Sequence, residues 1–228
     1  MISVTKLLFA REYFGDSLRY TKNAHRMKNG VAEGMGPVVV WNSTKTCNLK
    51  CRHCYMNSDA KKYQNELTTE EARRFIDDLA EFRVPVLLFS GGEPLLRPDF
   101  FELAEHAAAK GVRPTLSTNG TLIDRATAQR IKDIGVGYVG ISLDGLKDVN
   151  DKFRGKEGAY EAAMRGIENC TAVGQRVGLR FTINHHNIME LDKIFDFIEE
   201  EGINRVCFYH LVYSGRGNAM MEEDVTAQ

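Results

Sequence analysis

The sequence predicts an α/β protein with a parallel sheet, arranged as a partial (β/α)6 barrel of the TIM type. Three observations support this fold class. Short apolar segments alternate with amphipathic ones from residue 37 onward. The apolar segments are apolar nearly throughout, as in parallel strands covered by helices. A polar cluster follows each apolar segment. A doubly wound parallel sheet is the alternative architecture.

Six apolar segments are the expected strands. They cover residues 37–42, 84–90, 112–119, 137–145, 176–184 and 205–212. The expected helices cover residues 68–82, 97–111, 124–135, 158–174 and 188–202. The first of these begins at Thr68 or Thr69, which are good helix caps, and Gly111 and Gly135 end the next two. The acidic run EEDVT at 222–226 resembles the start of a further helix, so we expect the 228-residue chain to be a fragment of a longer protein.

Composition excludes several classes of protein. The chain is 43% hydrophobic and 27% charged with a net charge of −1, so no overall charge favours nucleic acid or an anionic membrane. No apolar run is long enough to span a bilayer, and Lys6, Arg11 and Glu12 interrupt what would be the core of a signal peptide. We therefore expect a cytoplasmic protein, with an N-terminal extension over residues 1–36 and a core domain over 37–228.

Three of the five cysteines lie in the stretch TCNLKCRHCYMN, at Cys47, Cys51 and Cys54. An odd number of cysteines without a secretory signal favours metal or redox use. Three thiolates on one loop can bind three irons of a 4Fe–4S cubane and leave the fourth open. A structural zinc site needs four ligands, and His53 is poorly placed as the fourth because it adjoins Cys54. The spacing favours the cluster and leaves zinc as the alternative, whereas Cys170 and Cys207 are expected in the core.

The motif C-x-x-x-C-x-x-C after the first strand resembles that of the radical S-adenosylmethionine (SAM) superfamily. The resemblance extends to Gly91-Gly92-Glu93-Pro94, to Ser117-Thr118-Asn119-Gly120 and to Ser142-Leu143-Asp144-Gly145, each at the end of a strand. The order of all four motifs matches, and the match runs from Pro37 to Gly217. It implies a radical SAM barrel in which SAM binds the open iron of a 4Fe–4S cluster. Reductive cleavage of SAM would then give a 5′-deoxyadenosyl radical that abstracts hydrogen from a substrate.

The resemblance also implies roles for particular residues. Cys47, Cys51 and Cys54 would be the cluster ligands and form the catalytic centre. Asp144 would bind a ribose hydroxyl or would only shape its turn, and Arg154 is either a carboxylate ligand or a solvated surface residue. The residues implied to contact SAM are His53 near the adenine, Gly91, Gly92 and Glu93 at the amino group, Ser117, Thr118 and Asn119 at the ribose or methionine, and Ser142 with Arg154 at the carboxylate.

Three longer stretches resemble the radical enzymes of siroheme-dependent haem and haem d1 biosynthesis. These are VTKLLFAREYFGDSLRYTKN, GPVVVWNSTKTCNLKCRHCY and FYHLVYSGRGNAM. They imply an enzyme of the didecarboxysiroheme deacetylase type, which removes side chains from a siroheme-derived tetrapyrrole. A low-potential donor, flavodoxin or ferredoxin, is expected with it. The alternative is a peptide-maturing radical SAM enzyme, and a second 4Fe–4S cluster would belong to a C-terminal region beyond this chain. A remote alternative is a non-catalytic zinc or iron–sulfur module.

Candidate substrate residues follow the last two strands. His185 and His186 follow the fifth strand, and Tyr209 and His210 end the sixth. One histidine could ligate the iron of a tetrapyrrole. The alternative is that 185–187 is a polar turn and that one of Tyr209 and His210 faces outward, because side chains alternate along a strand.

Overall fold

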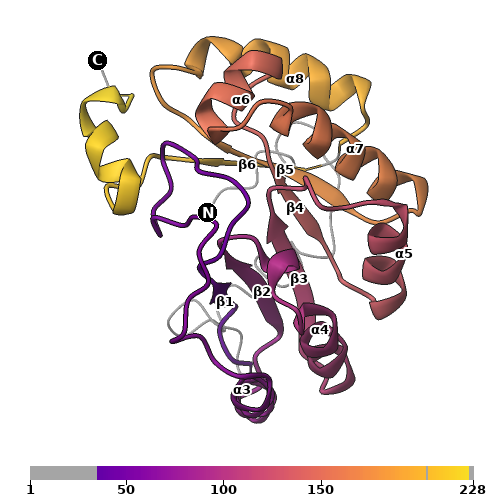
Figure 1. Ribbon diagram of the computed structural model, residues 1–228. Coiled ribbons are helices and arrows are strands. Elements are labelled where there is room, and N and C mark those ends of the chain that lie inside the picture. The colour runs from indigo at the N-terminus through magenta and orange to yellow at the C-terminus, as the bar shows by residue number, and fades with distance from the viewer. Residues whose placement is uncertain (1–34, 204, 226–228) are drawn as a thin grey trace, which may run out of the picture.

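The computed structural model describes residues 35–203 and 205–225, which contain a six-stranded parallel sheet (Figure 1). Its order is β1-β2-β3-β4-β5-β6, and every neighbouring pair is parallel. The strands are β1 (Val39–Thr44), β2 (Val86–Gly91), β3 (Arg113–Thr118), β4 (Val139–Ser142), β5 (Val177–Thr182) and β6 (Val206–Tyr209).

The strand order distinguishes the two expected architectures. A doubly wound sheet reverses its order at a switch point, whereas here each strand lies beside the next one in the sequence. Over the residues that the structure describes, no pairing joins β6 to β1, so the barrel is partial. The predicted partial barrel is confirmed, and the doubly wound alternative is wrong.

Helices follow the strands and cover one face of the sheet (Figure 1). They are α3 (Thr69–Glu81), α4 (Phe100–Ala109), α5 (Arg125–Ile134), α6 (Lys147–Arg154), α7 (Ala159–Ala172) and α8 (Leu191–Glu200), with the short 3-10 helices η2 (Pro94–Leu96), η3 (Ile188–Glu190) and η4 (Gly215–Glu223). The core between sheet and helices includes the fully buried Phe89, Phe100, Leu116, Ile141 and Phe181. None of the helices in the described ranges is both long and apolar enough to cross a bilayer.

Local sequence explains where these helices begin and end. Thr68 precedes α3, and its hydroxyl accepts a hydrogen bond from the Glu71 N–H while the Glu71 carboxylate accepts one from the Thr68 N–H. Asp124 caps α5 by accepting from the Thr127 N–H at 2.7 Å. Gly135 ends α5 in the left-handed conformation, with φ of 80°. Both Thr68 and Gly135 are therefore helix signals that the sequence predicted correctly.

Two segments differ from the expectation. The polar stretch 147–154, to which the sequence pattern assigned no element, forms α6, whose few buried side chains give no apolar stripe to detect. The acidic run at 222–226 does not begin a helix in the described residues, because Glu222 and Glu223 end η4 and Asp224 follows in extended conformation. The expected N-terminal extension lies outside the described residues except for its last two positions, and so do residues 226–228.

Candidate functional site

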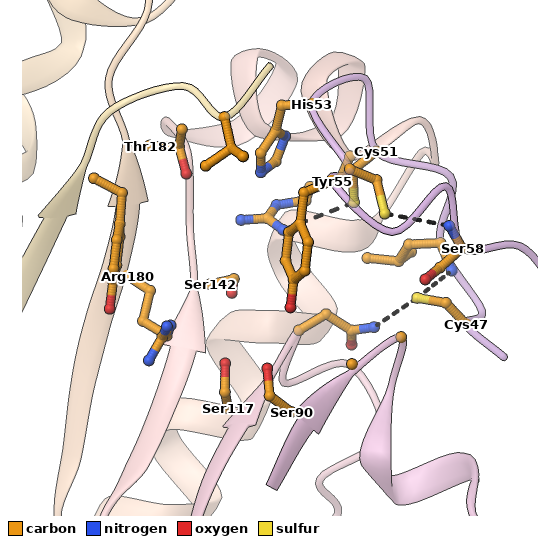
Figure 2. Close-up of a pocket in the computed structure, with 18 of the residues that line it drawn as sticks. Cys47, Cys51, His53, Tyr55, Ser58, Ser90, Ser117, Ser142, Arg180 and Thr182 are labelled. Atoms are coloured by element: carbon orange, nitrogen blue, oxygen red, sulfur yellow. Dashed lines mark hydrogen bonds between the residues drawn. The ribbon is translucent and has the colours of Figure 1, made fainter. Parts of the chain in front are cut away.

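A cavity of about 270 Å³ opens at the C-terminal ends of the strands (Figure 2). The cysteine loop and η4 lie at the same end of the sheet (Figure 1). All six strands or the loops after them contribute to the lining of the cavity. The predicted site residues that line it are Cys47, Cys51, His53, Cys54, Gly91, Gly92, Ser117, Thr118, Asn119, Ser142, Arg154, Tyr209 and His210. Four predicted residues do not line it, namely Glu93, Asp144, His185 and His186.

The three cysteines of the loop are free thiols at one side of this cavity (Figure 2). Cys47 and Cys51 are buried, and Cys54 is half-buried. Each sulfur faces a donor: the Leu49 N–H lies 3.5 Å from Cys47 Sγ, Arg154 Nη1 lies 3.7 Å from Cys51 Sγ, and the Ser58 N–H lies 3.3 Å from Cys54 Sγ. Donors around sulfur are the usual surroundings of iron–sulfur ligands, whose potentials they tune.

The electrostatics of the loop keep its buried thiols protonated when no positive centre is bound. Burial raises the pKa of Cys47 to about 11 and also raises the pKa of Cys51, and the neighbouring thiols add to both shifts. These thiols therefore stay protonated unless a positive centre stabilises the thiolates. No set of three cysteine, histidine or acidic side chains in the described residues converges on a single ion. A cubane instead gives each cysteine its own iron, so the three residues fit a cluster better than zinc.

Gly91 and Gly92 bring the end of β2 against the start of the cysteine loop. A Cβ at Gly91 would lie 2.3 Å from the Thr44 carbonyl oxygen, and one at Gly92 would lie 2.2 Å from that of Thr46. Gly91 also has φ of 122°, which favours glycine. The two glycines therefore leave bare backbone at the cavity wall, a place where a polar ligand group can be bound by main-chain atoms.

Glu93 lies behind this wall rather than in it. Its carboxylate is fully buried and accepts hydrogen bonds from the Thr118 hydroxyl at 2.8 Å, the Asn119 N–H at 2.8 Å and the Leu95 N–H at 3.2 Å. Burial raises the pKa of Glu93 to about 6, and the bonds from Asn119 and Thr118 oppose the shift. In this structure the carboxylate joins the loop after β2 to the end of β3, while Gly91, Gly92 and Ser117 present the surface to the cavity.

Arg154 and Asp144 form a buried ion pair next to His53 of the cysteine loop. Asp144 makes an ion pair with Arg154, lies 3.6 Å from His53 Nε2, and accepts the Thr182 N–H at 2.8 Å. His53 stacks on Phe153 with ring centroids 4.6 Å apart, and burial lowers the pKa of His53 to about 4, which keeps it neutral. The surface alternative for Arg154 is wrong, because Arg154 is buried. In this structure Asp144 accepts hydrogen bonds and pairs with Arg154 without lining the cavity.

The predicted substrate residues separate into two groups. Tyr209 and His210 line the cavity. His185 and His186 lie in a turn, both exposed, and His186 Nε2 lies 2.7 Å from Glu223 Oε2. The polar-turn alternative therefore describes residues 185–187, and of the predicted histidines beyond the fifth strand only His210 reaches the cavity within the described residues.

Several lining residues were not predicted from the sequence. These are Leu49, Tyr55, Ser58, Ser90, Arg180, Thr182, Val212 and Arg216. Arg180 gave one signal: it is a cation inside an otherwise apolar strand, VGLRFT. Arg216 lies in the stretch FYHLVYSGRGNAM, and its guanidinium bonds the cysteine loop.

Comparisons with known proteins agree with this geometry. Residues 41–198 match the family model of the radical SAM superfamily. The chain is 51% identical to the Fe-coproporphyrin III synthase of Methanosarcina barkeri, over 100% of this chain and 58% of that protein. It is 44% identical to the pre-heme d1 synthase of Dinoroseobacter shibae, over 95% of this chain and 53% of that protein.

A solved structure shares the fold. Native anSMEcpe with bound AdoMet and Cp18Cys peptide matches with a TM-score of 0.66 at 23% identity, over 77% of this chain and 51% of the other. The chain thus spans about half the length of the relatives it matches. Members of the matched family use a 4Fe–4S cluster with SAM, which the three free cysteines and the glycine-walled cavity fit. The chain belongs to the radical SAM superfamily.

Proposed function

We propose that this chain carries the cluster and SAM sites of an enzyme that modifies a siroheme-derived tetrapyrrole. The observation that carries the proposal is the meeting of Cys47, Cys51 and Cys54 with bare glycine backbone and hydroxyl side chains around one cavity. When bound and reduced, the cluster supplies the electron that cleaves SAM to a 5′-deoxyadenosyl radical. The chain itself positions the cofactor and the substrate and keeps water away.

The residues would divide this work by their chemistry. Cys47, Cys51 and Cys54 would ligate three irons, and the nearby Arg154 guanidinium would offset part of the thiolate charge at Cys51. The backbone of Gly91 and Gly92 would accept the SAM ammonium group. The residues proposed around the rest of SAM are Ser117, Thr118, Asn119 and Ser142 near the ribose and methionine, Arg154 near the carboxylate and His53 near the adenine.

Among the roles expected from the sequence, two take a different form in this proposal. Glu93 is proposed to act on SAM only through its charge and through the loop that it holds, because its oxygens already accept three hydrogen bonds. Asp144 is proposed to hold Arg154 and the end of β5 in place. Neither side chain would then need to touch SAM directly.

The substrate class rests on the relatives. The relatives from Methanosarcina barkeri and Dinoroseobacter shibae are named as synthases of Fe-coproporphyrin III and of pre-heme d1, and both compounds are haem-type tetrapyrroles. We propose removal of acetate side chains, as in the didecarboxysiroheme deacetylase type. The peptide alternative has support from a mycofactocin maturase, which is 36% identical over 81% of this chain, and from a peptide-bound structure at 23% identity that shows the shared fold. It stays the second candidate.

We further propose the domain division expected above, with an extension over 1–36 and a core over 37–228. A flavodoxin or ferredoxin would supply electrons in the cytoplasm, where low-potential donors and reduced thiols coexist. A second 4Fe–4S cluster would belong to sequence beyond this chain.

Electron paramagnetic resonance on anaerobically reconstituted, dithionite-reduced protein tests the cluster and SAM sites. We expect a reduced 4Fe–4S signal that changes when SAM is added. Cys47→Ala, Cys51→Ala and Cys54→Ala should lose the signal, whereas the matched controls Cys170→Ala and Cys207→Ala should keep it. Bound zinc without iron, or a signal indifferent to SAM, would refute the proposed sites.

Optical titration with iron coproporphyrin tests the substrate class. We expect a shift of its Soret band on binding to the reconstituted protein. The band should not change when buffer alone replaces the protein. Failure to bind any iron tetrapyrrole, with the cluster and SAM sites intact, would favour the peptide alternative.

A further inference from the structure

Arg180 lies on β5 across the cavity from the cysteines (Figure 2). It is opposite Ser142 of β4 and Cys207 of β6 in the strand register. A cation in the middle of a parallel strand is unusual, because such strands are apolar nearly throughout. The Arg180 side chain lines the cavity and does not pack in the core between the sheet and the helices. The positive charge at this position would therefore serve a group bound in the cavity and not the packing of the fold.

Gly140 makes room for Arg180 inside the barrel, and Gly178 makes room for Tyr138 beside it. Gly140 and Gly178 are register partners on β4 and β5. A Cβ at Gly140 would lie 2.9 Å from Arg180 Cδ, and a Cβ at Gly178 would lie 2.6 Å from the Tyr138 hydroxyl oxygen. Any larger residue at Gly140 would displace the Arg180 side chain. The space that Arg180 occupies is thus shaped by neighbouring strands.

The guanidinium of Arg180 lies over the ring of Tyr209, 4.8 Å from its centroid. Stacking on a ring face leaves the N–H groups at the edge of a guanidinium available to an anion. Within residues 35–203 and 205–225, Arg180 has no carboxylate partner. Arg180 is therefore fixed in orientation but not neutralised.

The other two arginines of the cavity are already engaged. Arg154 pairs with Asp144. Arg216 donates to the carbonyl oxygens of Cys51 at 2.7 Å and of Ser58 at 2.8 Å. No aspartate or glutamate of the described residues lines the cavity. An anion that enters would find Arg180 as the guanidinium with open donors, in surroundings that lack a competing negative charge.

We infer that Arg180, stacked on Tyr209, binds a carboxylate arm of the substrate and sets which neighbouring side chain faces the cysteine side of the cavity. This inference rests on the proposed tetrapyrrole function. The cavity lining already contains the residues proposed to hold SAM, so we place only a side arm of the macrocycle inside it, beside Arg180, with the ring at the mouth. Arg180 is then a specificity residue on the wall opposite the cluster loop.

The test compares two ligands and three variants of the reconstituted protein. The ligands are iron coproporphyrin with free carboxylates and its tetramethyl ester, both followed by optical titration. We expect Arg180→Met to weaken binding of the free acid about 10- to 100-fold and to leave binding of the ester unchanged. Arg180→Lys keeps the charge but loses the two-pronged geometry, so it should recover only part of the affinity. Arg205→Met is the matched control, because Arg205 also stacks on a tyrosine, Tyr138 at 4.9 Å, but lies outside the cavity lining.

Iron content and SAM affinity, measured on each variant, separate the outcomes. Unchanged values show that the variant folds and holds both cofactors. Weaker SAM binding by Arg180→Met with tetrapyrrole binding intact would overturn the inference and assign Arg180 to the SAM carboxylate. Equal losses for acid and ester would overturn it in favour of a structural role. If wild-type protein binds neither tetrapyrrole, the proposed function itself fails and the inference fails with it.

Discussion

The carboxylate of Glu93 is a charge in a site with no solvent contact. Ionisation there is opposed by burial, and three donors from Leu95, Thr118 and Asn119 offset only part of that cost. The GGEP motif predicted Glu93 as a SAM-contacting residue, whereas the structure places its carboxylate behind the cavity wall. The depth of Glu93 depends on how the loops after β2 and β3 meet, which no local pattern encodes.

Titration of Glu93 should make the stability of the cluster-free chain depend on pH. Burial raises the pKa of Glu93 from 4.5 to about 6, so the folded chain keeps this proton over a range where the unfolded chain has lost it. The stabilisation from this proton is present at low pH and is lost as the pH rises from about 4.5 to about 6, by about 2 kcal/mol in total.

Urea unfolding of wild-type protein and Glu93→Gln at pH 4 and pH 7 measures this term. The glutamine variant cannot titrate. Its free energy of unfolding minus that of wild type should therefore be about 2 kcal/mol higher at pH 7 than at pH 4, because only wild type loses stability as the pH rises. Glu102→Gln, an exposed carboxylate on α4, controls for the substitution itself. A relative stability of Glu93→Gln that stays constant with pH would contradict the expected shift.

At the scale of elements, η4 restrains the cysteine loop through hydrogen bonds from Arg216. Arg216 of η4 donates to the Cys51 and Ser58 carbonyl oxygens and, at 2.9 Å, to Asn57 Oδ1. The Arg216 N–H also donates to the Cys54 carbonyl oxygen at 2.9 Å. One side chain thus bridges the segment between two cysteines and the segment after the third, so it restrains the spacing of the three sulfurs.

Removal of this restraint should make the cluster easier to lose. We expect Arg216→Ala to reconstitute with iron but to release the cluster several-fold faster to a chelator, because the loop can open more often. Arg216→Lys should lose its cluster at a rate between those of wild type and Arg216→Ala, because one ammonium group cannot donate to the acceptors on both sides of the loop. The decay of the visible absorption of the cluster measures the rate.

Arg52→Ala is the matched control for Arg216, because Arg52 lies on the same loop but is half-exposed and pairs with Glu223. Its cluster should be lost at nearly the wild-type rate. Equal rates for Arg216→Ala and wild type would show that the cysteine loop holds its shape without η4.

Elements with strong local signals were predicted from the sequence, and elements fixed by tertiary contacts were not. The capping pair of α3 and Gly135 after α5 are local, and both are observed. Helix α6 depends instead on Asn150, whose side chain accepts the Asp144 N–H at 3.1 Å, and on Gly155, where a Cβ would lie 2.5 Å from the Lys50 carbonyl oxygen. Both contacts reach other loops, so the sequence of α6 alone does not reveal the helix.

The whole molecule explains why the site was only partly predictable. Parallel strands in sequential order must end at one edge, so the meeting of the cysteines with the polar loops followed from the order of elements alone. Arg180 was missed because its motif is a single residue within a strand, and which face it occupies depends on the register with Ser142 and Cys207. Its importance appears only with Gly140 on the neighbouring strand, which leaves room for its side chain.

The open side of the partial barrel should be its least protected wall. In the described residues β6 pairs with β5 alone and every residue of β6 is half-buried, whereas β3 has neighbours on both sides and is buried from its second residue onward. We expect amides of β6 to exchange with deuterium markedly faster than those of β3, because fewer contacts must break.

Ligands should slow this exchange in different places. SAM should protect the ends of β2 and β3, whereas iron coproporphyrin should protect β6, where Tyr209 supports Arg180. Hydrogen–deuterium exchange read by mass spectrometry on the reconstituted protein separates the two patterns. Protection of β6 by SAM alone would contradict the ligand pattern, because it would place the cofactor on the wall that we assign to the substrate. Similar exchange of β3 and β6 without ligand would show that the open side is as stable as the centre of the sheet.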